Sequence, residues 1–187
     1  LGAVPYPPGA RAARSVWLGP REGKLRVITV AVRTFRQPIL DDPCPRLCAV
    51  VAQVRAETPV IVVDVHGETT SEKIAIGRYL DGRVSAVLGT HTHVQTADEQ
   101  IFPGGTAFLC DAGMCGPVES ILGRAIEPIV GRFISNLPAA VPVPQGGDRP
   151  RGALVEVCEQ TGAPRGRGRG QEAGAPAPQA RSYGATP

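Results

Sequence analysis

The chain has 187 residues, of which 42% are hydrophobic and only 4% aromatic, so it can form one domain with a core of Val, Ile, Leu and Ala. Its formal net charge of +3 is too small to indicate nucleic-acid binding, and we expect no nucleic-acid partner. No segment approaches the ~20 consecutive apolar residues of a membrane span, so we expect no membrane association either.

The five cysteines are an odd number, and their spacings match no zinc-ribbon pattern, which favours reduced thiols. Since disulfides are rare in the cytoplasm, we predict a cytoplasmic protein. The chain begins at Leu1, and its first 20 residues show no helix or strand pattern. We therefore expect it to be the later part of a longer protein.

Apolar runs alternate with helical segments in the first half of the chain, which is typical of an α/β fold. In chain order we predict a strand at Leu25–Val32, a helix from Asp42-Pro43 to about Glu57, a strand at Val60–Val65, a helix from a capping box at Thr69–Glu72 to Leu80, and a strand at Val84–Leu88. The three strands are apolar enough to be buried on both faces of a sheet.

The second half of the chain has a different pattern. We predict a hairpin of Gln100–Phe102 and Thr106–Cys110, helices at Pro117–Gly123 and Glu127–Asn136, and a last strand at Ala153–Val157. From residue 162 the composition shifts to Gly, Pro, Ala, Arg and Gln, and we expect a disordered low-complexity tail over residues 162–187. The folded domain should therefore be residues 1–161.

All three histidines of the chain follow predicted strands. His66 ends the run from Val60, and His91 and His93 follow the run Ala86–Thr90. Open α/β sheets bind ligands at the carboxyl ends of their strands, and neutral imidazole is a common ligand of divalent metals. The simplest chemistry that joins the three is metal-dependent hydrolysis. The alternative for each histidine is a hydrogen-bonded structural role.

Several segments match one known family. They are Asp64–Lys73, Gly77–Val87, Gly89–Glu99 and Asp111–Pro117, together with Tyr6–Gly9 and Arg33–Phe35. Jointly they resemble the YmdB-type bacterial metallophosphoesterases, a branch of the calcineurin-like phosphoesterases. The resemblance covers roughly Val4 to Thr161, and this long joint run is far more specific than the segment Gly89-Thr90-His91-Thr92-His93 alone.

The resemblance implies an αββα sandwich with two divalent metal ions, iron, manganese or similar, at the strand ends. It implies that His66, His91 and His93 are metal ligands and that the substrates are phosphodiesters, with 2′,3′-cyclic nucleotides as candidates. The family's earlier half supplies an Asp, a Glu and an Asn ligand and the histidine that acts as acid, and no segment here matches them. The catalytic residue is therefore unknown, and we expect this chain to be an incomplete, inactive portion that holds one ion or none.

Four neighbours of the histidines have polar side chains. Thr90 and Thr92 are candidates for phosphate binding. Asp64 should face the same side of its strand as His66 and could orient the imidazole, or have only a surface or capping role. For Glu68 we favour hydrogen bonding over metal ligation. Further along the chain, we expect a helix-capping or turn role for Asp111. Lys73 could attract an anionic substrate, but we favour a solvent-exposed helix face for it.

The sequence also departs from the family pattern. The family usually has Ala-Glu-Ala where this chain has Gly67-Glu68-Thr69, and a threonine where Cys115 stands. Ala31-Val32 replaces a more polar pair before Arg33. None of these positions is an expected ligand, so the departures indicate either sequence drift or a relaxed copy.

Two further hypotheses compete with a phosphodiesterase. The first is a non-catalytic metal-binding or regulatory remnant, which the unmatched ligands favour. The second is an amidohydrolase-like enzyme, but that fold needs ~250 residues and an early His-x-His pair, and here the pair lies mid-chain. A sheet face left uncovered by this chain would also favour association between copies, so we expect a homo-oligomer.

Overall fold

The computed structural model describes residues 16–17, 25–32 and 43–171. These divide into two compact units, the first with the described residues up to 114 and residues 151–170, the second with residues 115–150 and 171. The predicted N-cap Asp42, most of the opening loop, the matched segments Tyr6–Gly9 and Arg33–Phe35, and residues 172–187 lie outside the described residues.

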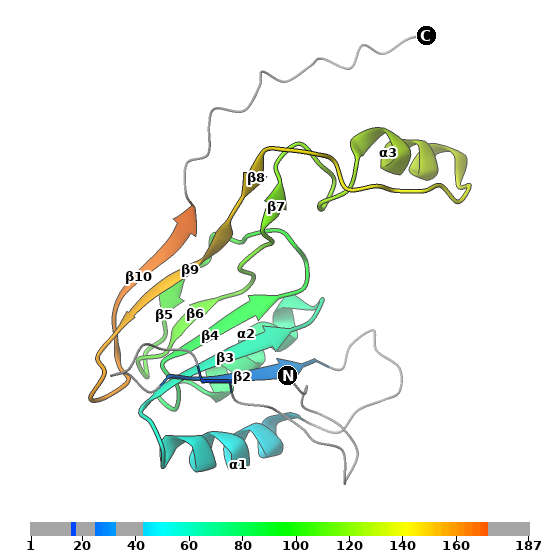
Figure 1. Cartoon of the computed structure of the whole chain (residues 1–187). Helices are drawn as coiled ribbons and strands as arrows, with labels where there is room; N and C mark the ends of the chain where they lie inside the picture. The colour runs from blue at the N-terminus through cyan, green and yellow to red at the C-terminus, as the bar shows by residue number, and fades with distance from the viewer. Residues whose placement is uncertain (1–15, 18–24, 33–42, 172–187) are drawn as a thin grey trace. The chain divides into compact units, whose positions relative to one another are not determined.

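A six-stranded sheet forms the centre of the first unit, in the order β1-β2-β3-β4-β6-β5 (Figure 1). The strands are β1 Val16–Trp17, β2 Leu25–Ala31, β3 Val60–His66, β4 Ala86–Thr90, β5 Gln100–Ile101 and β6 Ala107–Leu109. The pairs β2–β3, β3–β4 and β4–β6 are parallel, and the edge strands β1 and β5 pair antiparallel to their neighbours. The predicted strands and the hairpin are confirmed, with β4 beginning two residues later than predicted.

Two helices cover one face of this sheet. Helix α1, Pro43–Arg55, connects β2 to β3, and helix α2, Thr70–Tyr79, connects β3 to β4. Residues of β2 (Ile28, Val30), of β3 (Ile61, Val63, Val65), of α1 (Leu47, Val51) and of α2 (Ile76) form one core cluster. The connections β2–α1–β3 and β3–α2–β4 both lead to the next strand in the same direction across the sheet. Because such crossovers between parallel strands are right-handed, both helices lie on the same side of the sheet.

The opposite face of the sheet is only partly covered. In β3 the residues Ile61, Val63 and Val65 are completely buried, whereas Val62, Asp64 and His66 are partly exposed. The prediction that this strand is buried on both faces is therefore wrong for its second face. The alternation matters for function, because it places Asp64 and His66 on the face that the helices leave open.

A second sheet lies against part of that open face. It consists of β9, Arg151–Val157, paired with β10, Pro164–Gln171. Residues 153–155 of β9 line a small pocket together with Leu88 of β4 and Leu109 of β6. Helices, main sheet and second sheet are thus successive layers, and the predicted α/β fold class is confirmed. Strand β10 differs from the prediction of a tail without packed structure from residue 162.

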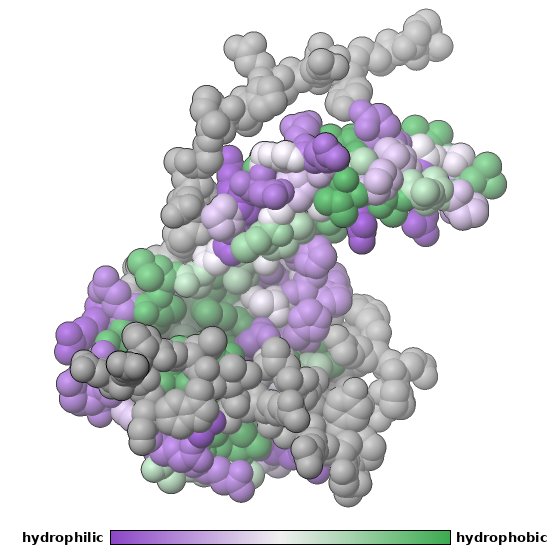
Figure 2. All heavy atoms as spheres, in the orientation of Figure 1, coloured by the Kyte–Doolittle hydropathy of each residue, from purple (hydrophilic) through white to green (hydrophobic). Residues whose placement is uncertain are grey.

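The second unit contains β7, Gly116–Pro117, paired antiparallel with β8, Asp148–Arg149, and helix α3, Ile126–Ser135. The predicted helix at 117–123 is wrong, because residues 118–124 form bends and turns in which Leu122 and Gly123 have positive φ. Apolar residues of α3 are exposed, with Phe133 at 85% and Ile134 at 82%, and Figure 2 shows this as green surface on the helix. Within the described part of the chain, no helix has the length and apolar character needed to cross a bilayer.

Candidate active site

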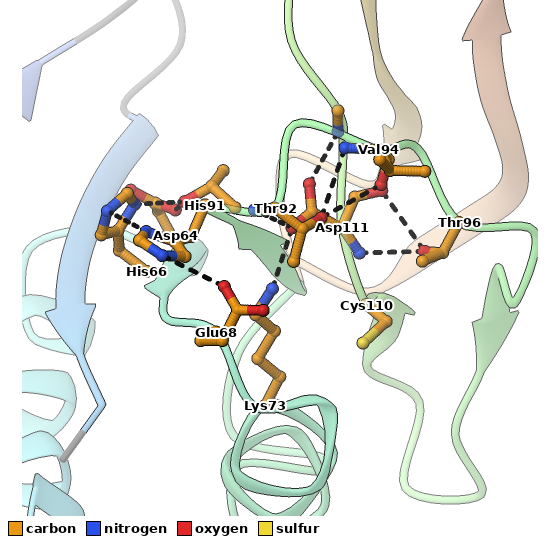
Figure 3. A network of polar contacts seen from close by, with 12 residues as sticks. Asp64, His66, Glu68, Lys73, His91, Thr92, Val94, Thr96, Cys110 and Asp111 are labelled. Atoms are coloured by element: carbon orange, nitrogen blue, oxygen red, sulfur yellow. Dashed lines mark hydrogen bonds and ion pairs between the residues drawn. The ribbon is translucent and has the colours of Figure 1, made fainter. Parts of the chain in front are cut away.

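The site is built where two parallel strands end side by side. His66 is the last residue of β3, Thr90 is the last residue of β4, and the two are register partners. His91 follows Thr90 directly, and its Nδ1 lies 3.1 Å from His66 Nε2. The two rings are nearly perpendicular, at 89°, with centroids 4.8 Å apart (Figure 3). The structure therefore brings His66 and His91 together, as the sequence predicts.

A chain of hydrogen bonds orients the His66 ring. The Thr90 hydroxyl donates to Asp64 Oδ1 at 2.7 Å, and the same oxygen lies 3.0 Å from His66 Nδ1. A threonine hydroxyl has a single proton, which is used here for the carboxylate. The contact with His66 then requires a proton on Nδ1, so that Nε2 presents a lone pair on the side of His91. This is the tautomer that a metal ligand binding through Nε2 needs.

The sequence suggested a direct contact between Asp64 and an imidazole, and the structure inserts Thr90 between them. The Thr90 hydroxyl, a candidate for phosphate binding, already serves two neighbours. Glu68 lies close to the second histidine, with its Oε2 3.3 Å from His91 Nε2. A carboxylate at this position can accept a hydrogen bond from Nε2 of the His91 ring.

The loop after β4 has an unusual backbone. His91 and His93 have φ values of 115° and 67°, which non-glycine residues rarely adopt. Such conformations cost about 1–3 kcal/mol each, and they persist mainly at functional sites that the surrounding structure fixes. Both side chains are exposed to solvent. Contacts from the surrounding structure must therefore hold this loop in its conformation.

The distance between the two imidazole nitrogens can be compared with the distance expected for two ligands of one metal ion. Two imidazole nitrogens that bind the same ion at about 2.0–2.2 Å are separated by about 3.0–3.5 Å, and the His66–His91 separation of 3.1 Å fits. However, among residues 16–17, 25–32 and 43–171 no three His, Cys, Asp or Glu side chains are grouped so that they could hold one ion. The described residues thus place two imidazole nitrogens at a spacing that one ion could accept, without a third possible ligand grouped beside them.

A buried ion pair lies beside the histidine loop. Lys73 of α2 donates to Asp111 Oδ2 at 2.9 Å, and their side chains are 0% and 1% exposed. The predicted solvent-exposed position of Lys73 is wrong. The predicted turn role of Asp111 is confirmed by the Gly113 amide, which donates to Asp111 Oδ1 at 2.9 Å. The Thr92 amide donates to Asp111 Oδ2, whereas the Thr92 hydroxyl contacts the backbone of Val94.

The pKa of Asp111 reflects these contacts. Burial by itself would raise the pKa of this carboxyl, but the hydrogen bonds from Lys73, Gly113 and Thr92 outweigh it and hold the pKa below its ordinary value. A signal for the pair was present in the sequence. Lys73 shares helical spacing with Ile76, and a lysine in such an apolar stripe needs a buried partner.

The chain matches the family model described as YmdB-like protein over residues 5–166. It is 44% identical over 156 residues to a Bacillus subtilis protein named 2′,3′-cyclic-nucleotide 2′-phosphodiesterase. The aligned region covers 83% of this chain and 59% of the relative. The chain thus spans about three fifths of the relative's length.

Two solved structures are also similar. One is a hypothetical protein from Thermus thermophilus, with a TM-score of 0.74, 36% identity, and coverage of 89% of this chain and 64% of that one. The other is described as a novel phosphatase from Mycoplasma pneumoniae, with a TM-score of 0.73, 29% identity, and coverage of 84% and 56%. Together with the match of the family model over most of its length, these likenesses show that the chain belongs to the YmdB-like protein family.

Proposed function

We propose that this chain contributes the histidine side of a metal-dependent phosphodiesterase site. The observation that supports this most directly is the facing pair His66 Nε2 and His91 Nδ1, 3.1 Å apart at the carboxyl ends of two parallel strands. The histidine pair belongs to a chain whose relatives are named as a phosphodiesterase and as a phosphatase. His93, in the same loop, is proposed as a further ligand, although the described residues do not group it with His66 and His91 around one ion.

In this proposal each residue has a separate task. His66 and His91 would hold a divalent ion such as manganese or iron, with Asp64 and Thr90 fixing the His66 tautomer. Such an ion supplies Lewis acidity and charge neutralisation at a phosphate. Glu68, at 3.3 Å from His91, would compensate the positive charge that collects at the site. The general acid is not among the residues assigned here.

The proposed substrates are phosphodiesters, and 2′,3′-cyclic nucleotides are the first candidates because the Bacillus subtilis relative is named for them. The test is hydrolysis of 2′,3′-cyclic AMP and of bis-p-nitrophenyl phosphate with added manganese or iron. We expect His66→Ala and His91→Ala to abolish any metal-dependent turnover and to weaken metal binding. Thr58→Val, near the opposite end of β3, is the control for general destabilisation. Turnover that is unchanged in both histidine variants would contradict the proposal.

A second candidate is a metal-binding chain without catalysis of its own. The specific observation in its favour is that the described residues group no three possible ligands. The two candidates differ in one measurement on the same sample. Metal binding that depends on His66 and His91 without hydrolysis of either phosphodiester supports the non-catalytic role, and histidine-dependent hydrolysis supports the enzyme.

A further inference from the structure

We propose that the buried Asp111–Lys73 pair positions the His91–His93 loop, and that Asp111 acts on the site through the backbone of Thr92. This inference deepens the proposed function, because it names the residues that hold the histidine loop in place. It does not depend on the identity of the metal or of the substrate.

The contacts of Asp111 join three segments at one point. Its Oδ2 accepts from Lys73 Nζ at 2.9 Å and from the Thr92 amide at 3.0 Å, and its Oδ1 accepts from the Gly113 amide at 2.9 Å. Figure 3 shows Lys73 pointing from α2 toward Asp111, with Thr92 close to the same carboxylate. Helix α2, the histidine loop and the turn after β6 are thus fixed to each other through one carboxylate.

The backbone of Asp111 adds a second attachment to the same loop. The Asp111 amide donates to the Thr96 hydroxyl at 2.9 Å, and the Thr96 amide donates to the Asp111 carbonyl at 3.1 Å. The loop from Thr92 to Thr96 is therefore bonded to Asp111 at both ends. His93 lies between these two attachments, and His91 directly precedes the first.

The burial of the pair argues for a positioning role. A buried lysine and aspartate lose their hydration, which costs free energy. Proteins in which apolar side chains of similar volume replace such an ion pair are often equally stable or more stable. Stability alone therefore does not explain why charges are placed here. An ionised carboxylate can, however, accept several hydrogen bonds in fixed directions, and charge-assisted bonds are the strong ones.

The carboxylate of Asp111 accepts a hydrogen bond from the part of the loop whose backbone is strained. His91 has a φ of 115°, and the residue after it donates its amide to Asp111 Oδ2. Without that bond the loop can relax toward ordinary φ values, which would turn the His91 ring away from His66. Gly89 completes the arrangement, because a Cβ there would lie 1.7 Å from the Cys110 carbonyl oxygen and 2.9 Å from Lys73 Cδ. The close approach of β4, β6 and Lys73 therefore requires a glycine.

The first experiment compares Asp111→Asn with the wild type in the absence of metal. The variant keeps the shape of the side chain and loses the charge that serves Lys73 and Thr92 together. We expect amide hydrogen exchange at Thr92 to accelerate by about tenfold or more, because the single neutral amide oxygen of asparagine is a weaker acceptor than the carboxylate that it replaces. Nitrogen chemical shifts of the His91 ring should move at the same time, because its Nδ1 would no longer face His66.

Asp81→Asn is the matched control. Asp81 also fixes a loop by accepting two backbone amides, those of Gly104 at 2.8 Å and Thr106 at 3.2 Å, in the hairpin between β5 and β6. We expect it to destabilise the protein without changing the Thr92 amide or the histidine rings. Equal changes at His91 in both variants would mean that the histidines respond only to general loosening, and would overturn the inference.

The second experiment measures Co²⁺ binding, with the absorption spectrum of the bound ion as readout. We expect Asp111→Asn to lower the affinity by about 10–100-fold, as losses of ligand-orienting partners do. If the wild type binds no Co²⁺, the proposed metal site fails, while the metal-free exchange and ring measurements still decide the positioning role. If the wild type binds and Asp111→Asn binds equally well with the same spectrum, the positioning role is wrong.

Lys73→Met provides a second variant in case Asp111→Asn does not fold. Methionine fills the space under Gly89 and removes the ammonium group, so Asp111 keeps the Thr92 and Gly113 amides as donors. We expect a smaller effect on Thr92 exchange than in Asp111→Asn, because Lys73 acts on the loop only through the carboxylate. An effect on His91 in Lys73→Met without any change at Thr92 would contradict the proposed route.

Discussion

Replacing Thr90 by valine tests the tautomer of His66 with a minimal change of shape. The substitution removes one hydroxyl, which donates to Asp64 Oδ1 at 2.7 Å and accepts from His66 Nδ1 at 3.0 Å. A net hydrogen bond to a charged group contributes about 1.5–3 kcal/mol and a neutral one about 0.5–1.5 kcal/mol. Because all three side chains are partly exposed and water can replace the hydroxyl, we expect the lower end, about 1–2 kcal/mol of lost stability.

The functional effect of Thr90→Val should exceed the effect on stability. Without the hydroxyl, the proton of His66 can occupy either ring nitrogen, and the form protonated on Nε2 loses the lone pair that faces His91. Loss of such an orienting partner typically lowers metal affinity by about 10–100-fold. The assays are urea unfolding for stability, Mn²⁺ or Co²⁺ titration for affinity, and nitrogen NMR of the imidazoles for the tautomer.

The same substitution near the start of β3 provides the comparison. Thr58 is buried just before the strand, and its hydroxyl accepts from the Val60 amide at 3.2 Å. Thr58→Val should destabilise the protein by a similar amount and leave metal affinity unchanged. A Thr90→Val protein that keeps the Nδ1-protonated form of His66 and wild-type affinity would refute the assignment of the hydrogen-bond chain.

Three further predictions concern other parts of the first unit. Gly89→Ala should prevent stable folding, because its Cβ would lie 1.7 Å from the Cys110 carbonyl oxygen. Gly152→Ala is the control, since the space around its Cβ is open, and it should unfold like the wild type in a thermal unfolding assay. Because the pKa of Asp111 is held below its ordinary value, its contribution to stability is complete above about pH 4 and is lost as the pH falls through the lowered pKa. Between neutral pH and pH 3, Asp111→Asn should therefore lose less stability than the wild type, as measured by urea unfolding. Hydrogen bonds from Thr161 lower the pKa of Cys158 to about 7, and burial raises the pKa of Cys110, so iodoacetamide at pH 7 should label Cys158 well before Cys110, as mass spectrometry of timed samples would show.

The elements that were predicted from the sequence are those whose pattern is local. The runs at 25–32 and 60–65 are continuous, β-branched and bounded by turn residues, and both form parallel strands close to the predicted bounds. The hairpin around residues 103–105 is likewise specified by its own glycines and proline. The apolar, buried Val84 resembles a strand residue and therefore predicts a start of β4 at Val84, but it lies in a bend, and the strand begins at Ala86.

The predictions that failed depend on tertiary contacts. The helix expected at 117–123 begins with an acceptable proline and contains apolar residues, but Pro117 pairs with Asp148 in a sheet that sequence patterns do not reveal. In the tail, the alternation of Arg and Gly from residue 165 is typical of disordered chains, and the strand there depends on β9 as its partner. Neither pairing is indicated by the pattern of the segment itself, so the sequence predicted neither.

The candidate site shows the same division. The residue types and their places after strands were enough to group His66 with His91, because parallel strands bring their carboxyl ends to one edge. The sequence could not show that Thr90 would stand between Asp64 and His66, since this depends on the register of two strands whose contacting residues are 24 positions apart. The helical spacing of Lys73 indicates that it needs a buried partner, but it does not identify that partner, because Asp111 lies 38 residues away.

The departures from the family pattern near His66 are connected in space. Gly67 stands where the family usually has alanine, and Ala31-Val32 replaces a more polar pair. A Cβ on Gly67 would lie 1.9 Å from Val32 Cγ2, and the Val32 amide donates to the His66 carbonyl at 3.2 Å. Val32 is 1% exposed, so it fills the space that an alanine methyl group would need. The residues at positions 32 and 67 are therefore complementary in shape, and the packing next to His66 depends on both.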